Sequence, residues 1–209
     1  MGDLGDDIKD AHADVGSSYI RIRPGVSNAS GEYCVTKLNR QATKPFVREF
    51  FQEGAFDWDT EARAGDVIQL ATTGWRFLIP NLTPKVFADE LIEYSSVLYK
   101  CNVSGQIWRP TEVDGVWDSN YRMQGGFSLV AQDVFALQTE SLYGNDLESD
   151  NELNTLIGLQ DHELYVSAGY GIQVFDRYEP RSGEYYKIET IKKRRYDNVW
   201  VCQITEDTR

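Results

Sequence analysis

The chain has 209 residues and a formal net charge of −12, with 41% apolar and 12% aromatic side chains. Because nucleic-acid-binding proteins present cationic surfaces to phosphate, this charge argues against a general DNA- or RNA-binding protein. The sequence has no apolar run near the roughly 20 residues of a membrane span, and its first residues, MGDLGDDIKD, do not have the basic and apolar regions of a signal peptide. We therefore expect a soluble protein that is made in the cytosol and does not contact a membrane.

The first expected element is a helix within DLGDDIKDAHADVG, residues 3–16. Its apolar residues recur at spacings of four, three and four, which places them on one helix face: Leu4, Ile8, Ala11 and Val15. Aspartates in the first turns favour the helix dipole, and Gly16 suits the C-terminal end. A second, short helical turn is expected after Pro84, in PKVFADELI.

Most of the remaining chain alternates between apolar and polar residues, which is the period of a strand. The expected strands are 19–23, 32–38, 45–56, 66–70, 75–79, 92–103, 126–137, 163–168, 172–178, 185–191 and 198–204. Two long segments are expected to be loops: 111–126, and the acidic 139–154. Many short strands with one good helix predict a mainly β protein, a small barrel or sandwich of antiparallel strands with a short N-terminal helix.

Two parts of the sequence are similar to each other. The stretch VLYKCNV (97–103) matches VWVCQI (199–204) when the cysteines are aligned, and Asp66 and Asp176 each stand nine residues before an aromatic residue. Since a three-stranded sheet cannot bury its inner face alone, we expect two related three-stranded units that complete one β core. This predicts four segments: an N-terminal helix and strands (1–63), the first unit (64–110), an insertion with the acidic loop (111–162) and the second unit (163–209).

Motifs of common enzyme classes do not occur in the sequence: there is no GxSxG, GxxxxGK[ST], HExxH or GxGxxG. The three cysteines are far apart and the chain has only two histidines, so we expect reduced thiols and no metal site. We therefore predict no catalytic residue, no cofactor and no enzymatic activity. A carbohydrate- or ligand-binding β module that uses the aromatics around Trp117 and Tyr121 remains an alternative.

One basic cluster stands out, KKRR at 192–195, where a hairpin tip is expected between two strands. Three uses are open to it: a solvated tip, a docking contact with an acidic patch of a neighbouring subunit, and a contact with DNA phosphate. Because acidic segments are plentiful on the same chain, a ring of identical copies with complementary charge is one consistent arrangement. The candidate subunit-interface residues are Lys192, Lys193, Arg194, Arg195, Asp3, Asp6, Asp7, Glu148, Asp150, Glu152 and the rim aromatic Trp108.

The segment GDVIQLATTGWRFLIPNLTPKVFADELIEYSSVLYKCNVSGQIWRP resembles a pattern of virion structural proteins in tailed bacteriophages, with KCN as its most specific element. The end of the chain, GIQVFDRYEPRSGEYYKIETIKKRRYDNVWVCQITEDTR, is similar to the C-terminal hairpin of head–tail joining proteins, also called head-completion or stopper proteins. This resemblance implies a non-catalytic β-barrel that forms a six- or twelve-fold ring around the DNA channel of the virion. Its partners would be copies of itself and portal, adaptor or tail proteins, with DNA as transient passing cargo. A tail or baseplate station is the alternative.

Overall fold

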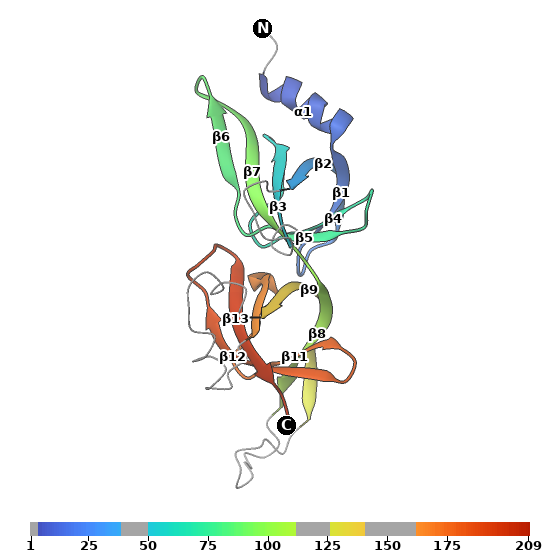
Figure 1. Ribbon diagram of the computed structural model, residues 1–209, viewed down its shortest axis with the longest axis vertical. Coiled ribbons are helices and arrows are strands. Elements are labelled where there is room, and N and C mark those ends of the chain that lie inside the picture. Colours follow the sequence, from blue (N-terminus) through green and yellow to red (C-terminus); the bar gives the residue numbers. More distant parts are fainter. Residues whose placement is uncertain (1–3, 39–49, 112–125, 141–161) are drawn as a thin grey trace. The chain divides into compact units, whose positions relative to one another are not determined.

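The computed structural model describes residues 4–38, 50–111, 126–140 and 162–209 (Figure 1). It divides into two compact units. The first comprises Met1–Cys101, Ser167–Gly169 and Tyr196–Val199, and the second comprises Asn102–Val166, Tyr170–Arg195 and Trp200–Arg209. Each unit is a six-stranded antiparallel barrel, so the prediction of a mainly β barrel protein with one short helix is confirmed.

The predicted N-terminal helix is present as α1 (Leu4–Val15), and it packs against strands of the first barrel. It ends at Gly16, whose N–H donates to the carbonyl of His12 at 2.8 Å. Gly5 is buried at the other end of the helix, where an added Cβ would lie 2.9 Å from the Trp58 ring. Absence of a side chain at Gly5 therefore lets the helix approach its own barrel closely.

Seven strands form the first unit: β1 (Ser17–Ile22), β2 (Ala29–Leu38), β3 (Phe51–Asp57), β4 (Val67–Leu70), β5 (Arg76–Leu78), β6 (Thr83–Phe87) and β7 (Glu90–Lys100). Their order is β3-β2-β1-β4-β5-β7, and pairing of β3 with β7 closes the barrel. Strand β6 extends the sheet by pairing with β7. Alternate residues of these strands point inward, and Phe56, Phe77 and Leu98 are fully buried in the core.

The helical turn expected after Pro84 is wrong, because this segment forms the β6–β7 hairpin. Ala88 and Asp89 make its turn with φ angles of 49° and 66°. Two consecutive residues with positive φ are characteristic of the two-residue turns whose twist matches that of paired strands. Neither residue is a glycine, so the usual sequence signal of such a turn is missing here.

Six strands form the second barrel: β8 (Val103–Pro110), β9 (Phe127–Glu140), β10 (His162–Ser167), β11 (Arg177–Arg181), β12 (Glu184–Lys192) and β13 (Val199–Glu206). They close in the order β10-β13-β12-β11-β8-β9 around a core that includes Ile107, Tyr178 and Ile188. The sequence analysis did not predict β8. It was also wrong to extend a strand over 172–176, because β11 begins only at Arg177.

The two barrels have the same topology. Strands β8 to β13 follow one another around the second barrel as β1, β2, β3, β4, β5 and β7 do around the first. The related halves are therefore real, but each half has six strands and closes its own barrel. The four predicted segments do not coincide with these units, since 64–110 contains strands of both barrels.

Hydrogen bonds show which residues of the two barrels are equivalent. The carbonyl of Asp66 accepts from the N–H of Ile79, and the carbonyl of Asp176 accepts from that of Ile188, both at 2.9 Å. The predicted match of Asp66 with Asp176 is therefore confirmed. The cysteine alignment is wrong: Cys101 N–H donates to the carbonyl of Arg76 (2.8 Å), three residues before Ile79. In the second barrel, Tyr185 lies three residues before Ile188, and its carbonyl accepts from the N–H of Asp207 at 2.7 Å. Cys101 is therefore equivalent to Asp207.

Candidate interaction surfaces

A buried ion pair fastens one corner of the first barrel. Asp66, with 2% of its surface exposed, accepts from Nε and Nη2 of Arg23 at 2.6 and 2.7 Å. The same Nη2 also donates to the carbonyl of Glu61 at 3.1 Å, and the carboxylate accepts from the N–H of Arg63 at 2.9 Å. One side-chain pair thus joins the end of β1 to the turn before β4, and both oxygens of the buried carboxylate have partners.

The second barrel repeats this corner. Asp176, 1% exposed, accepts from Nε and Nη2 of Arg109, both at 2.9 Å. The Nη2 group donates to the carbonyl of Gly171 at 2.9 Å, and the carboxylate accepts from the N–H of Gln173 at 2.8 Å. In both barrels the two backbone partners lie five and three residues before the aspartate: Glu61 and Arg63 in the first, Gly171 and Gln173 in the second. We call the two pairs, Arg23–Asp66 and Arg109–Asp176, the corner clamps.

The sequence analysis missed the corner clamps, although a signal for them exists. Both clamp arginines are followed by proline, at 23–24 and 109–110, so the dipeptide Arg-Pro is repeated at equivalent places in the two barrels. The cysteine alignment instead matched Cys101 with Cys202, which are not equivalent in the two barrels. Searching for repeated charged residues rather than repeated apolar patterns would have found both clamps.

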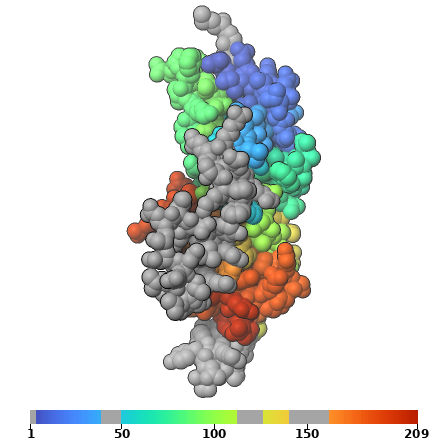
Figure 2. Space-filling model, in the orientation of Figure 1, coloured from blue at the N-terminus to red at the C-terminus, as the bar shows by residue number. Residues whose placement is uncertain are grey.

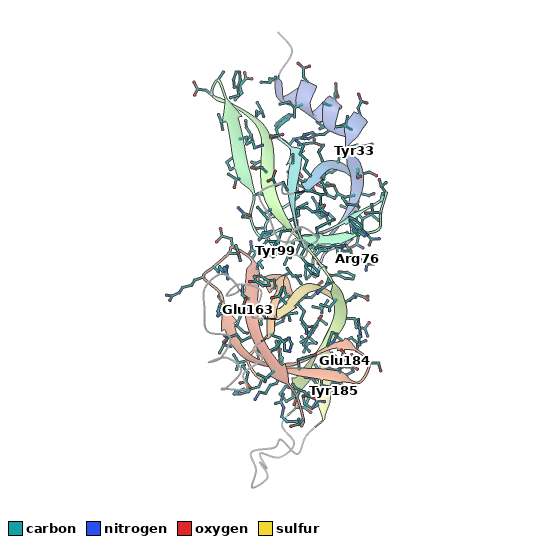
Figure 3. All side chains as sticks on the ribbon, in the orientation of Figure 1. Tyr33, Arg76, Tyr99, Glu163, Glu184 and Tyr185 are labelled. Carbon is teal, nitrogen blue, oxygen red and sulfur yellow. The ribbon has the colours of Figure 1, made fainter. Side chains whose placement is uncertain are left out.

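A third buried acid, Asp207, lies at the end of β13. Its carboxylate accepts from Nε of Arg177 and Nε of Arg209, each at 2.8 Å. The Arg177 guanidinium also stacks on the rings of Phe127 and Tyr185, the second of which is labelled in Figure 3. Burial alone would raise the pKa of Asp207, but the hydrogen bonds from the two arginines outweigh it and lower this pKa to about 2.

Replacing Asp207 by asparagine is expected to remove part of the acid sensitivity of the second barrel. Because the folded-state pKa is lowered, the carboxylate stabilises the fold above its ordinary pKa near 4, and this stability is lost as pH falls toward about 2. The variant should lose on the order of 2 kcal/mol at pH 7 and little at pH 2. Urea unfolding at pH values from 2 to 7 measures this, and parallel pH curves for the two proteins would contradict it.

Helix α1 is attached through a buried histidine. Nδ1 of His12 lies 2.8 Å from Oδ1 of Asp57, and Nε2 lies 3.5 Å from Oε2 of Glu93. Burial raises the pKa of Asp57, while the hydrogen bond from His12 opposes this increase. Lys9 adds an exposed ion pair with Asp59. The buried contact of His12 therefore contributes to holding the helix on the barrel, together with the close approach at Gly5.

Substitution of His12 by alanine is expected to loosen α1, because it leaves the buried carboxylate of Asp57 without its hydrogen-bond partner on the helix. We expect a loss of about 2 kcal/mol and faster amide exchange across residues 4–15. Hydrogen–deuterium exchange with mass spectrometry measures both local and global opening. Lys9→Ala is the control on the same helix, since its exposed ion pair should contribute less than about 1 kcal/mol. Equal effects of the two substitutions would count against a special role of His12.

The basic cluster lies between β12 and β13, where the hairpin tip was expected. Two of its cations contact their own barrel. Nζ of Lys192 lies 3.0 Å from Oε1 of Glu163, which is labelled in Figure 3, and Nζ of Lys193 lies 4.4 Å above the Trp200 ring. Arg194 and Arg195 are exposed. Arg195 interacts electrostatically with Glu163 and helps to lower the pKa of that carboxyl. The docking role of the cluster remains a prediction.

The other predicted interface residues have varied surroundings. Asp6 and Asp7 are both exposed, and Asp6 accepts a hydrogen bond from Nε1 of Trp58 at 3.3 Å. Trp108 is half-buried, and its Nε1 donates to Glu179 at 3.0 Å. The remaining predicted acidic residues lie outside the described residues: Asp3, Glu148, Asp150 and Glu152.

The β6–β7 hairpin carries the apolar surface that the sequence analysis missed. It runs along the side of the first barrel to the end at which α1 lies, and its atoms, green in Figure 2, are at the surface. Val86 is 61% exposed and Phe87 is 62% exposed, and both stand directly before the turn. We call the segment 86–90 the hairpin tip. Its last two residues, Asp89 and Glu90, are acidic and exposed.

Comparisons with known proteins found no match: no family model, no characterised protein and no solved structure is similar to the chain at a significant level. In the described parts of the chain, no helix is long and apolar enough to cross a membrane. The same parts contain no group of three or more histidine, cysteine or acidic side chains placed to hold a metal ion.

Proposed function

We propose that this chain is a non-catalytic structural protein that works as a ring of identical copies at the head–tail connection of a tailed-phage virion, around the DNA channel. Portal, adaptor or tail proteins are its neighbours, and DNA passes through without lasting contact. The resemblance that suggested this role covers 64–110 and 168–209, and each of these segments contains the aspartate of one corner clamp.

The way the chain uses its buried acids supports a structural role. The four buried aspartates of the described chain are Asp57, Asp66, Asp176 and Asp207. Each one pairs with a histidine or arginine inside its own unit. A carboxylate that is held by a cation and buried serves to join strands, whereas a catalytic acid or base must reach a substrate. These groups stabilise the barrels.

The observation that carries the proposal is the exposed hairpin tip. Exposing two large apolar side chains next to each other is unfavourable by about 25 cal/mol per Å² of apolar surface, so such a patch typically marks a contact with another protein. Pro84, Lys85 and a register shift between Lys85 and Val86 protect the free edge of β6 from adding another strand. The hairpin is thus suited to bind through its side chains at the tip.

Charge supports the passage of DNA. The net charge of −12 and the exposed aspartates on the outer side of α1, Asp6, Asp7, Asp10 and Asp14, make a surface that repels phosphate. This repulsion acts over about 8–10 Å at physiological ionic strength. A duplex inside such a ring would slide rather than bind. Replacing these aspartates by lysine is expected to slow DNA ejection, and an unchanged ejection rate would count against this part of the proposal.

Two measurements test the proposed function. Mass spectrometry of purified virions is expected to find six or twelve copies, and separated heads and tails show whether the station is the neck or the tail. Sedimentation of the purified protein is expected to show self-association that Val86→Ser/Phe87→Ser weakens and Val15→Ser does not. Val15 is a matched control because it is 74% exposed but lies at the end of α1. A protein that stays monomeric, is missing from virions and binds glycans would instead be the carbohydrate-binding alternative.

A further inference from the structure

Phe175, in the corner of the second barrel, combines an unusual backbone with an exposed aromatic ring. Its φ angle is +73°, and a bulky residue with positive φ is a rare and strained conformation. The ring is nonetheless not used in the core: Phe175 is 55% exposed, and the preceding Val174 is 41% exposed. Phe175 therefore combines two unfavourable features, a strained backbone and an exposed apolar side chain. We call Val174 and Phe175 the apolar corner.

The equivalent position in the first barrel is a glycine. Gly65 and Phe175 each directly precede a clamp aspartate, and their N–H groups donate to the carbonyls of Ile79 and Ile188 at 2.8 and 2.9 Å. Gly65 has a φ of +93°. The barrel corner therefore forms with glycine, which adopts this backbone without strain. Since the fold itself does not require a phenylalanine here, its presence at Phe175 needs another reason.

The corner of the first barrel is covered by part of the same chain. A Cβ on Gly65 would lie 2.6 Å from the carbonyl oxygen of Asn198, so the turn before β13 packs directly on this corner. Pro24, beside it, is 3.1 Å from the position of a Cβ on Gly169. In the first barrel, this corner is therefore already a contact surface. In the second barrel the equivalent surface is apolar and open to solvent.

Hydrogen bonds on both sides hold the backbone of Phe175 in place. The N–H of Phe175 donates to Ile188, and its carbonyl accepts from Nη2 of Arg209 at 3.2 Å. The guanidinium groups nearby belong to Arg109, Arg177 and Arg209, and the carboxylates that hold them belong to Asp176 and Asp207. Glu189 also interacts electrostatically with Arg209, so guanidinium groups and carboxylates alternate beside the apolar corner.

We propose that the apolar corner binds the hairpin tip of a second copy of this chain, so that copies join head to tail. The two surfaces match in kind. The tip has exposed Val86 and Phe87 followed by acidic Asp89 and Glu90, and the corner has exposed apolar residues beside the guanidinium groups of Arg109 and Arg209. Contacts between two different patches of identical subunits are the type that closes rings by rotation. This proposal rests on the proposed function and names the two surfaces of its ring contact.

Phe175→Gly tests the role of the corner without harming the fold. Glycine accepts the positive φ, so the thermal midpoint of the variant should be unchanged or higher. Self-association measured by sedimentation equilibrium is expected to weaken at least about tenfold, as for an aromatic anchor at the centre of an interface. Val15→Ser is again the matched control and should associate like the unchanged protein. If Phe175→Gly associates as tightly as the unchanged protein, the corner is not the contact.

Mixing two variants tests the pairing itself. Phe175→Gly retains an intact hairpin tip, and Val86→Ser/Phe87→Ser retains an intact corner. Each variant alone is expected to be monomeric, whereas the mixture should form a 1:1 dimer that does not grow further. A mixture that stays monomeric would overturn the pairing of these two surfaces.

Self-association of the variants and the presence of the protein in virions distinguish the corner contact from the proposed ring function. If only the hairpin variant loses self-association, the ring proposal stands and the corner is excluded. If the unchanged protein neither associates nor occurs in virions, the proposed function fails, and the contact with a second copy fails with it.

Discussion

Replacement of Asp176 by asparagine is expected to destabilise the second barrel by about 3 kcal/mol or more. The substitution removes a buried negative charge that accepts two hydrogen bonds from Arg109 and one from the N–H of Gln173. It leaves the guanidinium of Arg109, whose side chain is 32% exposed, beside a neutral amide. Removing one partner of a buried ion pair typically costs about 3–5 kcal/mol, and the partial exposure of Arg109 places the expected loss at the lower end of this range. Urea unfolding measures the total loss.

The loss of stability should be confined to the strands around the substituted clamp. Hydrogen exchange with mass spectrometry should show faster exchange in β8, β11 and β12 after Asp176→Asn. Asp66→Asn is the matched variant, because its clamp in the first barrel has the same geometry. It should act on β1, β4 and β5. If each substitution loosened both barrels equally, the two units would not be independent in stability.

Replacement of Gly105 by alanine is the second large effect, with an expected loss of about 3 kcal/mol. Strand β8 passes so close to β11 at Gly105 that an added Cβ would contact the carbonyl of Glu179 and lie 2.8 Å from Cα of Pro180. Both obstacles are backbone atoms, which cannot rotate away as a side chain can. The pairing of β8 with β11 would have to shift, and with it the ring of Tyr178, 2.9 Å from the added atom.

Gly126→Ala is the control for this prediction. Gly126 lies just before β9, and the hydroxyl of Thr111 would be 3.7 Å from the new Cβ, which is ordinary van der Waals contact. Thermal unfolding should therefore separate the two glycine variants clearly, with Gly126→Ala close to the unchanged protein. Similar midpoints for both would mean that β8 and β11 can move apart at little cost.

The local elements were largely predictable, because they depend on residues that are neighbours in the sequence. The helix followed from apolar residues at helical spacing, and most strands followed from alternation. The errors lie where the usual local signal is weak. The turn at Ala88 and Asp89 has no glycine, and β8 contains Gly105 and ends in Arg-Pro. Weak local preference in these strands is overcome by pairing with distant strands.

The candidate site was less predictable, since none of its features depends on local pattern. The hairpin tip was expected to be helical, and the apolar corner was placed inside a strand. Its significance appears only when Phe175 is compared with Gly65, and that comparison requires the correct register of the two barrels. The predicted basic cluster lies where expected, but contacts within its own barrel already use Lys192 and Lys193.

By itself, the sequence determined the class of fold, the position of the helix and the existence of two related halves. Periodicity is a property of nearby residues, and so is the nine-residue spacing from Asp66 or Asp176 to the aromatic residue that follows it. Only the tertiary structure decided that each half closes its own barrel, and which residues correspond. The corner clamps join residues 43 and 67 positions apart in the chain. Such pairs are selected by the geometry of strand closure, in which many hydrogen bonds form together, and no short stretch of sequence contains that information.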